Sequence, residues 1–182
     1  MSQRTLIIST AAVNALVSAI SYTLYGWTAI GAHVAARSTA RVSALIFALA
    51  IAQPGLARWM ASLPSYVSLV YAFVAAHCVH FVDVATTLVL DRKHQLNQVP
   101  VTRDEVVFVG VLLVAIAGFT VTADRLTLRA LHALAITALF AIFMLAFTTH
   151  RLLPLRAVAV LLGLAAVLRI VALTSPRRVS VA

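Results

Sequence analysis

Residues 66–90 read YVSLVYAFVAAHCVHFVDVATTLVL, an apolar run interrupted by His77, His80 and Asp83. About 20 apolar residues are enough for a helix to cross a bilayer, so this stretch predicts a transmembrane helix. The three ionisable residues recur at intervals that place them on one stripe of that helix. Because ionisable groups are costly in hydrocarbon, the stretch also predicts a buried polar site with a partner or a function.

The rest of the chain extends this pattern. Of its 182 residues, 63% are hydrophobic and 10% are charged, whereas a soluble domain is about 45–50% apolar and about 25% charged. Apolar runs joined by short polar connectors predict an all-α membrane protein: a six-transmembrane-helix bundle that forms a single domain over residues 1–182, with both termini on one side. The helices are expected at residues 6–25, 42–58, 66–90, 106–123, 131–148 and 157–173.

Several features within this plan carry expectations of their own. Pro54-Gly55 predicts a break or kink in the second helix. His33 and Arg37 fall in the connector before it, and Asn14 is expected to hydrogen-bond between helices. The single cysteine, Cys78, excludes an internal disulfide and is expected to be a small buried residue.

The formal net charge of +9 comes from basic residues near the ends of the apolar runs. We interpret them as anchors in the headgroups of the lipid bilayer, so no nucleic-acid partner is expected, and Arg169 is expected to reach the headgroups from its helix end. Basic residues divide equally between the two sides of the predicted bundle, so the positive-inside rule leaves the orientation open.

His132, near the start of the fifth run, adds another intramembrane imidazole. Histidines that face each other from two helices are a way for a bundle to hold a haem iron. By depth along the helices, His77 is the better partner for His132 than His80. Asp83 is expected to orient an imidazole, to relay protons or to clasp two helices.

Other histidines are expected at the membrane interface rather than as ligands; they are His33, His94 and His150. The sequence contains no phosphate-binding glycine loop, nucleophile elbow, or flavin or nicotinamide fingerprint, so no catalytic residue is predicted. If the protein carries electrons, their soluble donor lies on another chain.

Three stretches resemble the ferric reductase-like transmembrane domain family, which includes the haem-binding membrane subunit of the bacterial methionine sulfoxide reductase system. They are TARVSALIFALAIAQPGLAR from Thr39, LVYAFVAAHCVHF and LRALHALAITALF, within a region from about Thr39 to about Arg151. The resemblance implies that His80 ligates haem, with His77 one turn before it, and that His132 is a ligand on the fifth helix. Arg41 and Arg129 are expected to pair with haem propionates or to anchor in headgroups.

The sequence departs from the two-haem members of that family. The position of their second histidine on the fifth helix is Leu145, and an earlier ligand on the third helix falls near Tyr66 or Val67. The resemblance therefore implies one haem b rather than two, held by His132 with His77 or His80.

The leading functional hypothesis is a multi-pass b-haem protein of the bacterial inner membrane. It would relay electrons from a quinol or a separate flavin reductase to an acceptor, as the membrane haem subunit of an oxidoreductase with a partner subunit. One alternative is a non-enzymatic scaffold or accessory subunit with a degenerate haem site. Another is a small proton-coupled transporter that uses His80 and Asp83. The electron donor and acceptor and the oligomeric state stay open.

Overall fold

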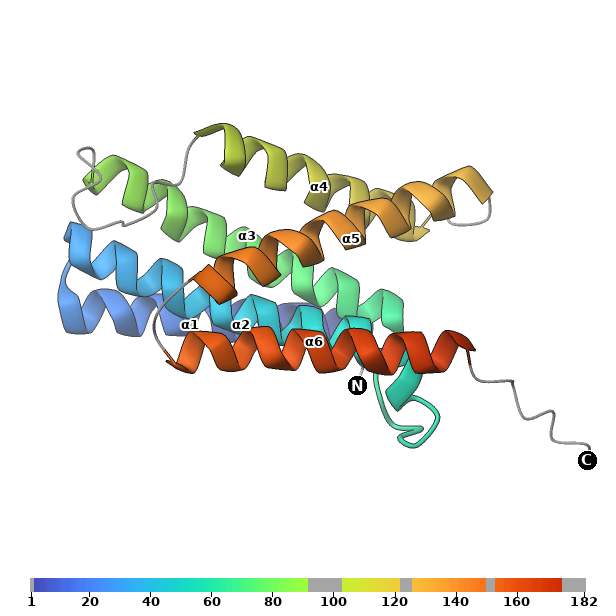
Figure 1. Ribbon diagram of the computed structural model, residues 1–182. Helices are drawn as coiled ribbons and strands as arrows, with labels where there is room; N and C mark the ends of the chain where they lie inside the picture. Colours follow the sequence, from blue (N-terminus) through green and yellow to red (C-terminus); the bar gives the residue numbers. More distant parts are fainter. Residues whose placement is uncertain (1, 92–102, 122–125, 150–152, 175–182) are drawn as a thin grey trace, which may run out of the picture.

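The computed structural model describes residues 2–91, 103–121, 126–149 and 153–174. In these ranges the chain forms only α-helices, which confirms the all-α prediction (Figure 1). The helices are α1 (Gln3–Tyr25), α2 (Ala29–Leu56), α3 (Tyr66–Leu90), α4 (Arg103–Val121), α5 (Leu126–Thr149) and α6 (Leu153–Thr174).

Five helices are long and apolar enough to cross a membrane, as judged by length and composition. The candidate spans are Gln3–Tyr25, Ala29–Leu56, Tyr66–Leu90, Leu128–Thr148 and Arg156–Thr174. The described part of α4 contributes a shorter apolar segment, Val106–Gly118. The chain therefore has the character of a multi-pass membrane protein, and a sixth span stays a prediction.

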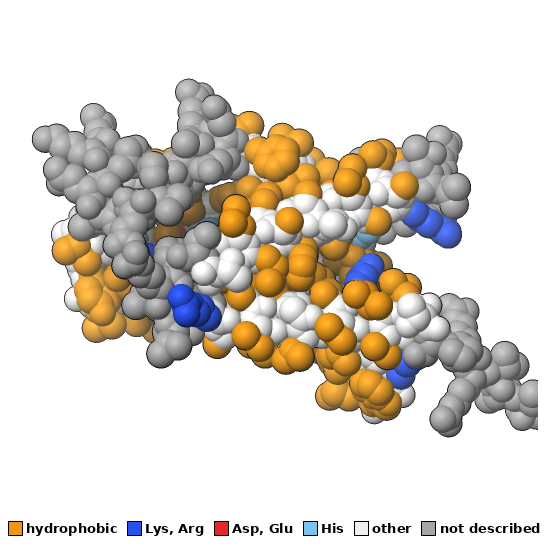
Figure 2. Space-filling view, in the orientation of Figure 1, with side chains coloured by type: hydrophobic (Ala, Val, Ile, Leu, Met, Phe, Trp, Pro, Cys, Tyr) orange, Lys and Arg blue, Asp and Glu red, His pale blue; other side chains and the backbone are white. Residues whose placement is uncertain are grey.

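Helix α2 is the centre of the bundle, since it packs against α1, α3 and α6. Helices α4 and α5 form a hairpin that lies over α3, and α5 crosses toward α6 (Figure 1). Phenylalanine side chains from three helices fill the space between these layers: the Phe47 and Phe73 ring centroids are 4.8 Å apart, and those of Phe47 and Phe143 are 5.3 Å apart. The outer faces remain largely apolar (Figure 2), as expected of helices that contact lipid.

Helix α2 begins well before the predicted residue 42. Thr28 caps it by accepting a hydrogen bond from the Gly31 amide at 3.2 Å, and Gly26 ends α1 with a φ of 72°, a left-handed conformation that favours glycine. His33 and Arg37 therefore lie inside α2, so their assignment to a connector was wrong. The alanine-rich sequence around them is compatible with a helix despite its polar residues.

The predicted break at Pro54-Gly55 is not observed, because α2 continues through Pro54 to Leu56. Gly55 is instead a point of close helix contact: a β-carbon there would lie 2.7 Å from the carbonyl oxygen of Leu168 on α6. Close by, the Arg58 guanidinium donates a hydrogen bond to the Ala172 carbonyl. The end of α2 is thus fixed directly against the backbone of α6.

Candidate functional site: a buried carboxyl, hydroxyl and imidazole cluster

Asp83 on α3 is 1% exposed, and side chains from two other helices converge on it. The Ser18 hydroxyl on α1 donates to Asp83 Oδ1 at 2.7 Å, and Thr39 Oγ1 on α2 lies 3.0 Å from Oδ2. The described residues provide this carboxyl group with hydroxyl partners and no ion pair. We refer to Ser18, Thr39, His80 and Asp83 as the Asp83 cluster.

Thr39 connects the carboxyl group to an imidazole. Its hydroxyl oxygen lies 3.2 Å from His80 Nδ1, as well as 3.0 Å from Asp83 Oδ2 and 2.8 Å from the Ala35 carbonyl oxygen. A hydroxyl carries one proton and can accept others. It can therefore donate to Asp83 while accepting from His80, or donate to His80 or Ala35 while accepting from a protonated Asp83. The expectation that Asp83 would contact an imidazole is met only indirectly, through Thr39.

His77 lies about one turn before His80 on α3, and the two ring centroids are 4.9 Å apart. Three aromatic rings surround it: Phe73 at 5.3 Å, Phe81 at 5.0 Å and Phe143 at 5.6 Å between centroids. We call these three residues the aromatic wall. The Nδ1 atom of His77 is buried without a hydrogen-bond partner among the residues that the structure describes. The polar stripe of α3 thus ends at an apolar barrier.

Tyr22 faces the Asp83 cluster from α1. Its ring stacks on Trp27 with 4.2 Å between centroids, and its hydroxyl is near enough to Asp83 to interact with it electrostatically. The same hydroxyl is buried and makes no hydrogen bond of normal geometry within the described ranges. It adds a polar atom beside Asp83 that sequence reasoning did not single out.

Asn14 joins three helices, as expected. It is completely buried, and its amide nitrogen donates to the Ala76 carbonyl on α3 and to Ser43 Oγ on α2 at 3.3 Å. These bonds hold α1 against α2 and α3 about one helical turn before Ser18, the residue through which α1 contacts the Asp83 cluster.

His33 and Asp91 form an ion-pair contact at the end of the bundle where α2 begins and α3 ends. His33 Nε2 lies 2.8 Å from Asp91 Oδ2, and the two side chains are 8% and 6% exposed. The assignment of His33 to a connector was wrong, because α2 starts early and His33 lies in its second turn, beside the end of α3. Its position at the membrane interface stays a prediction. The other two histidines assigned to the interface, His94 and His150, lie outside the described residues.

His132 on α5 contacts Tyr66 rather than His77. Its Nε2 atom lies 2.9 Å from the Tyr66 hydroxyl oxygen. Tyr66 is the first residue of α3, and at about 1.5 Å per residue His77 lies about 16 Å further along that helix. His132 and His77 are therefore not brought together, and the predicted axial pair does not fit one iron in this arrangement.

The two arginines expected to pair with haem propionates or to anchor in headgroups, and the single cysteine, lie on three different helices. Arg41 is partly buried and its Nε has no hydrogen-bond partner among the described residues, while Arg129 is exposed. Cys78 is exposed, so its expected burial was wrong, because it stands on the outward face of α3. Within the described ranges no group of three or more His, Cys, Asp or Glu side chains could hold a metal ion. Haem ligation stays a prediction.

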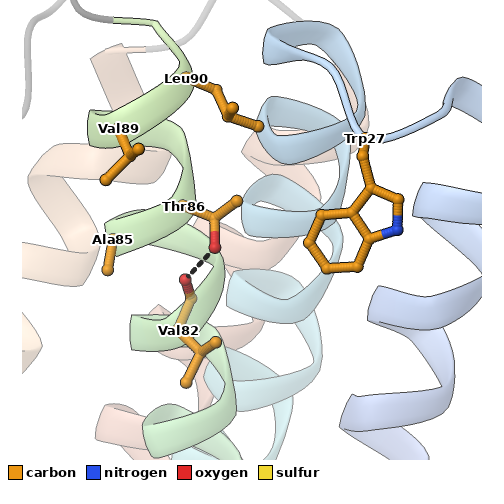
Figure 3. Close-up of a pocket in the computed structure, with 6 residues that line it drawn as sticks. All are labelled: Trp27, Val82, Ala85, Thr86, Val89 and Leu90. Carbon is orange, nitrogen blue, oxygen red and sulfur yellow. Dashed lines mark hydrogen bonds between the residues drawn. The ribbon is translucent and has the colours of Figure 1, made fainter.

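A shallow groove of about 380 Å³ lies on the outer side of α3 (Figure 3). The Thr86 hydroxyl in it donates to the Val82 carbonyl at 2.8 Å and is thereby satisfied. Its lining is apolar apart from Thr86 and offers no reactive group: Trp27, Val82, Ala85, Thr86, Val89 and Leu90.

Comparison with protein-family models, with curated proteins and with solved structures finds no match to this chain.

Proposed function

We propose that this multi-pass membrane protein binds and passes protons at the Asp83 cluster and couples their movement to the transport of a small solute. The observation that carries the proposal is the position of the Thr39 hydroxyl between His80 Nδ1 and Asp83 Oδ2, at 3.2 Å and 3.0 Å. Such a chain of hydrogen bonds can transmit a proton without moving a heavy atom far.

The proton transfer balances within the chain. A proton bound to the far nitrogen of His80 allows its Nδ1 proton to move to Thr39, while the Thr39 hydroxyl proton moves to Asp83. The reverse sequence returns the proton to His80. Ser18 supplies a further hydrogen bond to the carboxylate when Asp83 is ionised.

The surroundings of the cluster support proton binding more than a static ion pair. Ser18 and Tyr22 face Asp83 from α1, and Thr39 faces it from α2. A buried carboxylate without a cation is costly in an apolar medium, and adding a proton removes that cost. Ionisable residues in membrane helices commonly mark proton and substrate paths.

The Asp83 cluster lies closer to one end of the bundle than to the other, so protons have a shorter route to it from that end. Asp83 lies about 10 Å from the end of α3, on the side where His33 and Asp91 pair. In the opposite direction the aromatic wall closes the stripe beyond His77. On this proposal, Asp83 exchanges protons with the His33–Asp91 end, whereas proton exchange at the far nitrogen of His80 requires the hairpin that carries Phe143 to move.

We also propose that α4 crosses the membrane as a sixth span and that the protein resides in a bacterial inner membrane. The support for a sixth span is the position of α4, which pairs with α5 in one hairpin (Figure 1). The orientation in that membrane stays open.

The test measures protonation and flux on the full-length protein. Infrared difference spectra between acidic and alkaline buffer should contain a carbonyl band of protonated Asp83, and Asp83→Asn should remove that component while the bands of the other carboxyl groups remain. Liposomes that contain the protein and an internal pH dye should acidify under a proton gradient, and Asp83→Asn should remove most of that flux. Asp91→Asn is the matched control and should retain the band assigned to Asp83. If both signals persist in Asp83→Asn, the proposal is contradicted, and the remaining role for Asp83 is to hold the helices together.

The haem-binding electron carrier is the second candidate. It is favoured by His77 Nδ1, a buried imidazole nitrogen with no hydrogen-bond partner in the described part of the chain, as a metal ligand would be. If bound, haem would supply one-electron chemistry.

A dithionite-reduced minus oxidised spectrum of protein expressed with added haem tests this second candidate. An α band and a Soret shift that His77→Ala or His132→Ala abolishes would support it. A flat spectrum from well-folded protein, or a Soret band unchanged in both variants, would reject it.

A further inference from the structure

The guanidinium group of Arg169 on α6 lies over the ring of Tyr66, with 5.3 Å from its Cζ to the ring centroid. Its NH1 atom is buried and has no hydrogen-bond partner among the described residues. The sequence predicted that this side chain would reach the headgroups; in the structure it packs beside Tyr66 on α3 and His132 on α5. A buried guanidinium nitrogen without an acceptor is costly, so an acceptor from outside these residues would stabilise it.

The neighbouring groups also suit an acceptor ligand. The Tyr66 hydroxyl and His132 lie next to the guanidinium group, hydrogen-bonded to each other at 2.9 Å. The Nδ1 atom of His132 is buried near the Ile116 carbonyl without a hydrogen bond of normal geometry. Arg169 thus provides the charge, and Tyr66 and His132 provide polar atoms that can adjust to a bound oxygen.

The described charged side chains at this end of the bundle are all positive. They are those of Arg4, Arg58, Arg129 and Arg169. The acidic side chains that the structure describes are Asp83 and Asp91, and Asp83 lies about 25 Å along α3 from Tyr66. Within the described part of the chain, the charges near this site therefore favour an anion.

The site is open sideways to the bilayer. Helices α5 and α6 diverge toward this end (Figure 1), and basic and histidine side chains are visible in the opening between them (Figure 2). Arg169 lies about 7 Å from the end of α6, near the level of lipid headgroups. Exposed apolar side chains lie on α5 and α6 toward this end of the bundle, with Leu134 66% and Leu173 74% exposed.

We propose that Arg169, with Tyr66 and His132, binds the phosphate group of an anionic phospholipid that enters between α5 and α6. The guanidinium group donates to the phosphate oxygens. The apolar rim receives the acyl chains, which is why a lipid fits this opening better than free phosphate. This inference does not depend on proton transfer at the Asp83 cluster.

The test is native mass spectrometry of the full-length protein in uncharged detergent with added phosphatidylglycerol. We expect one tightly retained lipid, and we expect Arg169→Gln to weaken its binding about tenfold or more, because a charge-assisted hydrogen bond is lost. Arg169→Lys should have an intermediate effect, since an ammonium group is a point charge. Arg4→Gln, which removes an exposed arginine at the same end, is the matched control and should bind like the wild type.

Competing ligands separate the sources of phosphate. Diacylglycerol should fail to displace the lipid, and inorganic phosphate should displace it only in large excess. Displacement by inorganic phosphate at equal concentration would keep the phosphate site but overturn the lipid assignment. Equal losses in Arg169→Gln and Arg4→Gln would overturn the site.

If the variants do not fold, a measurement on the wild-type protein still tests the proposal. Solid-state NMR in phosphatidylglycerol vesicles should show a dipolar contact between lipid phosphorus and the Arg169 guanidinium nitrogens. Asp124, outside the described residues, is tested as a counter-ion through Asp124→Asn. If no phosphorus contact appears, or if Asp124→Asn strengthens lipid binding, as release of Arg169 from a counter-ion would, the proposal is overturned.

Discussion

His132 on α5 and Tyr66 on α3 are joined by a hydrogen bond of 2.9 Å between the imidazole Nε2 and the phenol oxygen. The α4–α5 hairpin also packs against α3 and α6, and the Tyr71 hydroxyl on α3 donates to the Ala117 carbonyl on α4 at 3.2 Å. The contact between His132 and Tyr66 fixes where the start of α5 sits on α3.

Tyr66→Phe should destabilise the protein by about 1–3 kcal/mol, because it leaves a partly buried imidazole nitrogen unpaired. The measurement is thermal unfolding in detergent. Tyr25→Phe, at an exposed tyrosine, is the control and should change stability by about 0.5 kcal/mol or less. Equal shifts in the two variants would contradict a structural role for the Tyr66 hydroxyl.

Thr39→Val should block proton movement between His80 and Asp83, since it keeps the shape of the side chain and removes the hydroxyl. We expect proton flux into liposomes to fall about tenfold or more, which corresponds to a barrier increase of about 1.4 kcal/mol. Thr39→Ser restores the hydroxyl and should recover most of the flux. Flux that survives in Thr39→Val would exclude the hydroxyl from the path.

His33 and Asp91 should be energetically coupled, because both side chains are nearly buried and their contact is 2.8 Å. A double-mutant cycle with His33→Gln and Asp91→Asn measures the coupling through unfolding in detergent. We expect a coupling energy of about 1 kcal/mol or more. Additive effects of the two substitutions would show that the contact contributes little.

Gly55→Ala should destabilise the protein by about 1–3 kcal/mol through overpacking, because the new methyl group meets the Leu168 backbone. Gly163→Ala on α6 is the matched control, since a β-carbon there has nothing within 4 Å. That control should be neutral or stabilising by about 0.5–1 kcal/mol, from the higher helix propensity of alanine. Thermal unfolding of both variants decides between a close contact and a general effect of alanine.

The apolar runs predicted most of the helices, because the length of a membrane-spanning segment leaves little freedom in where it begins and ends. The main error was the start of α2. Its first turns contain His33, Arg37 and Thr39, and polar residues are a poor guide to a boundary when the helix packs them inward.

The candidate site was predictable only in part. The spacing of His77, His80 and Asp83 placed them on one stripe, and the structure keeps them together on α3. The partners on other helices were not predictable, because Ser18 and Thr39 are ordinary small residues until the packing of α1 and α2 brings them to Asp83. Similarly, helix depth suggested His77 for His132, whereas the packing of α5 on the start of α3 selected Tyr66.

Because Gly55 has no side chain, α6 can pack closely against α2, and this packing also determines where the positive charge of Arg169 lies. The residue that the Gly55 backbone touches is Leu168, and Arg169 follows directly in α6. A substitution that pushed α6 outward would carry the guanidinium group away from Tyr66 without changing any charged residue. Variation at Gly55 would then alter lipid binding at Arg169 in addition to lowering stability.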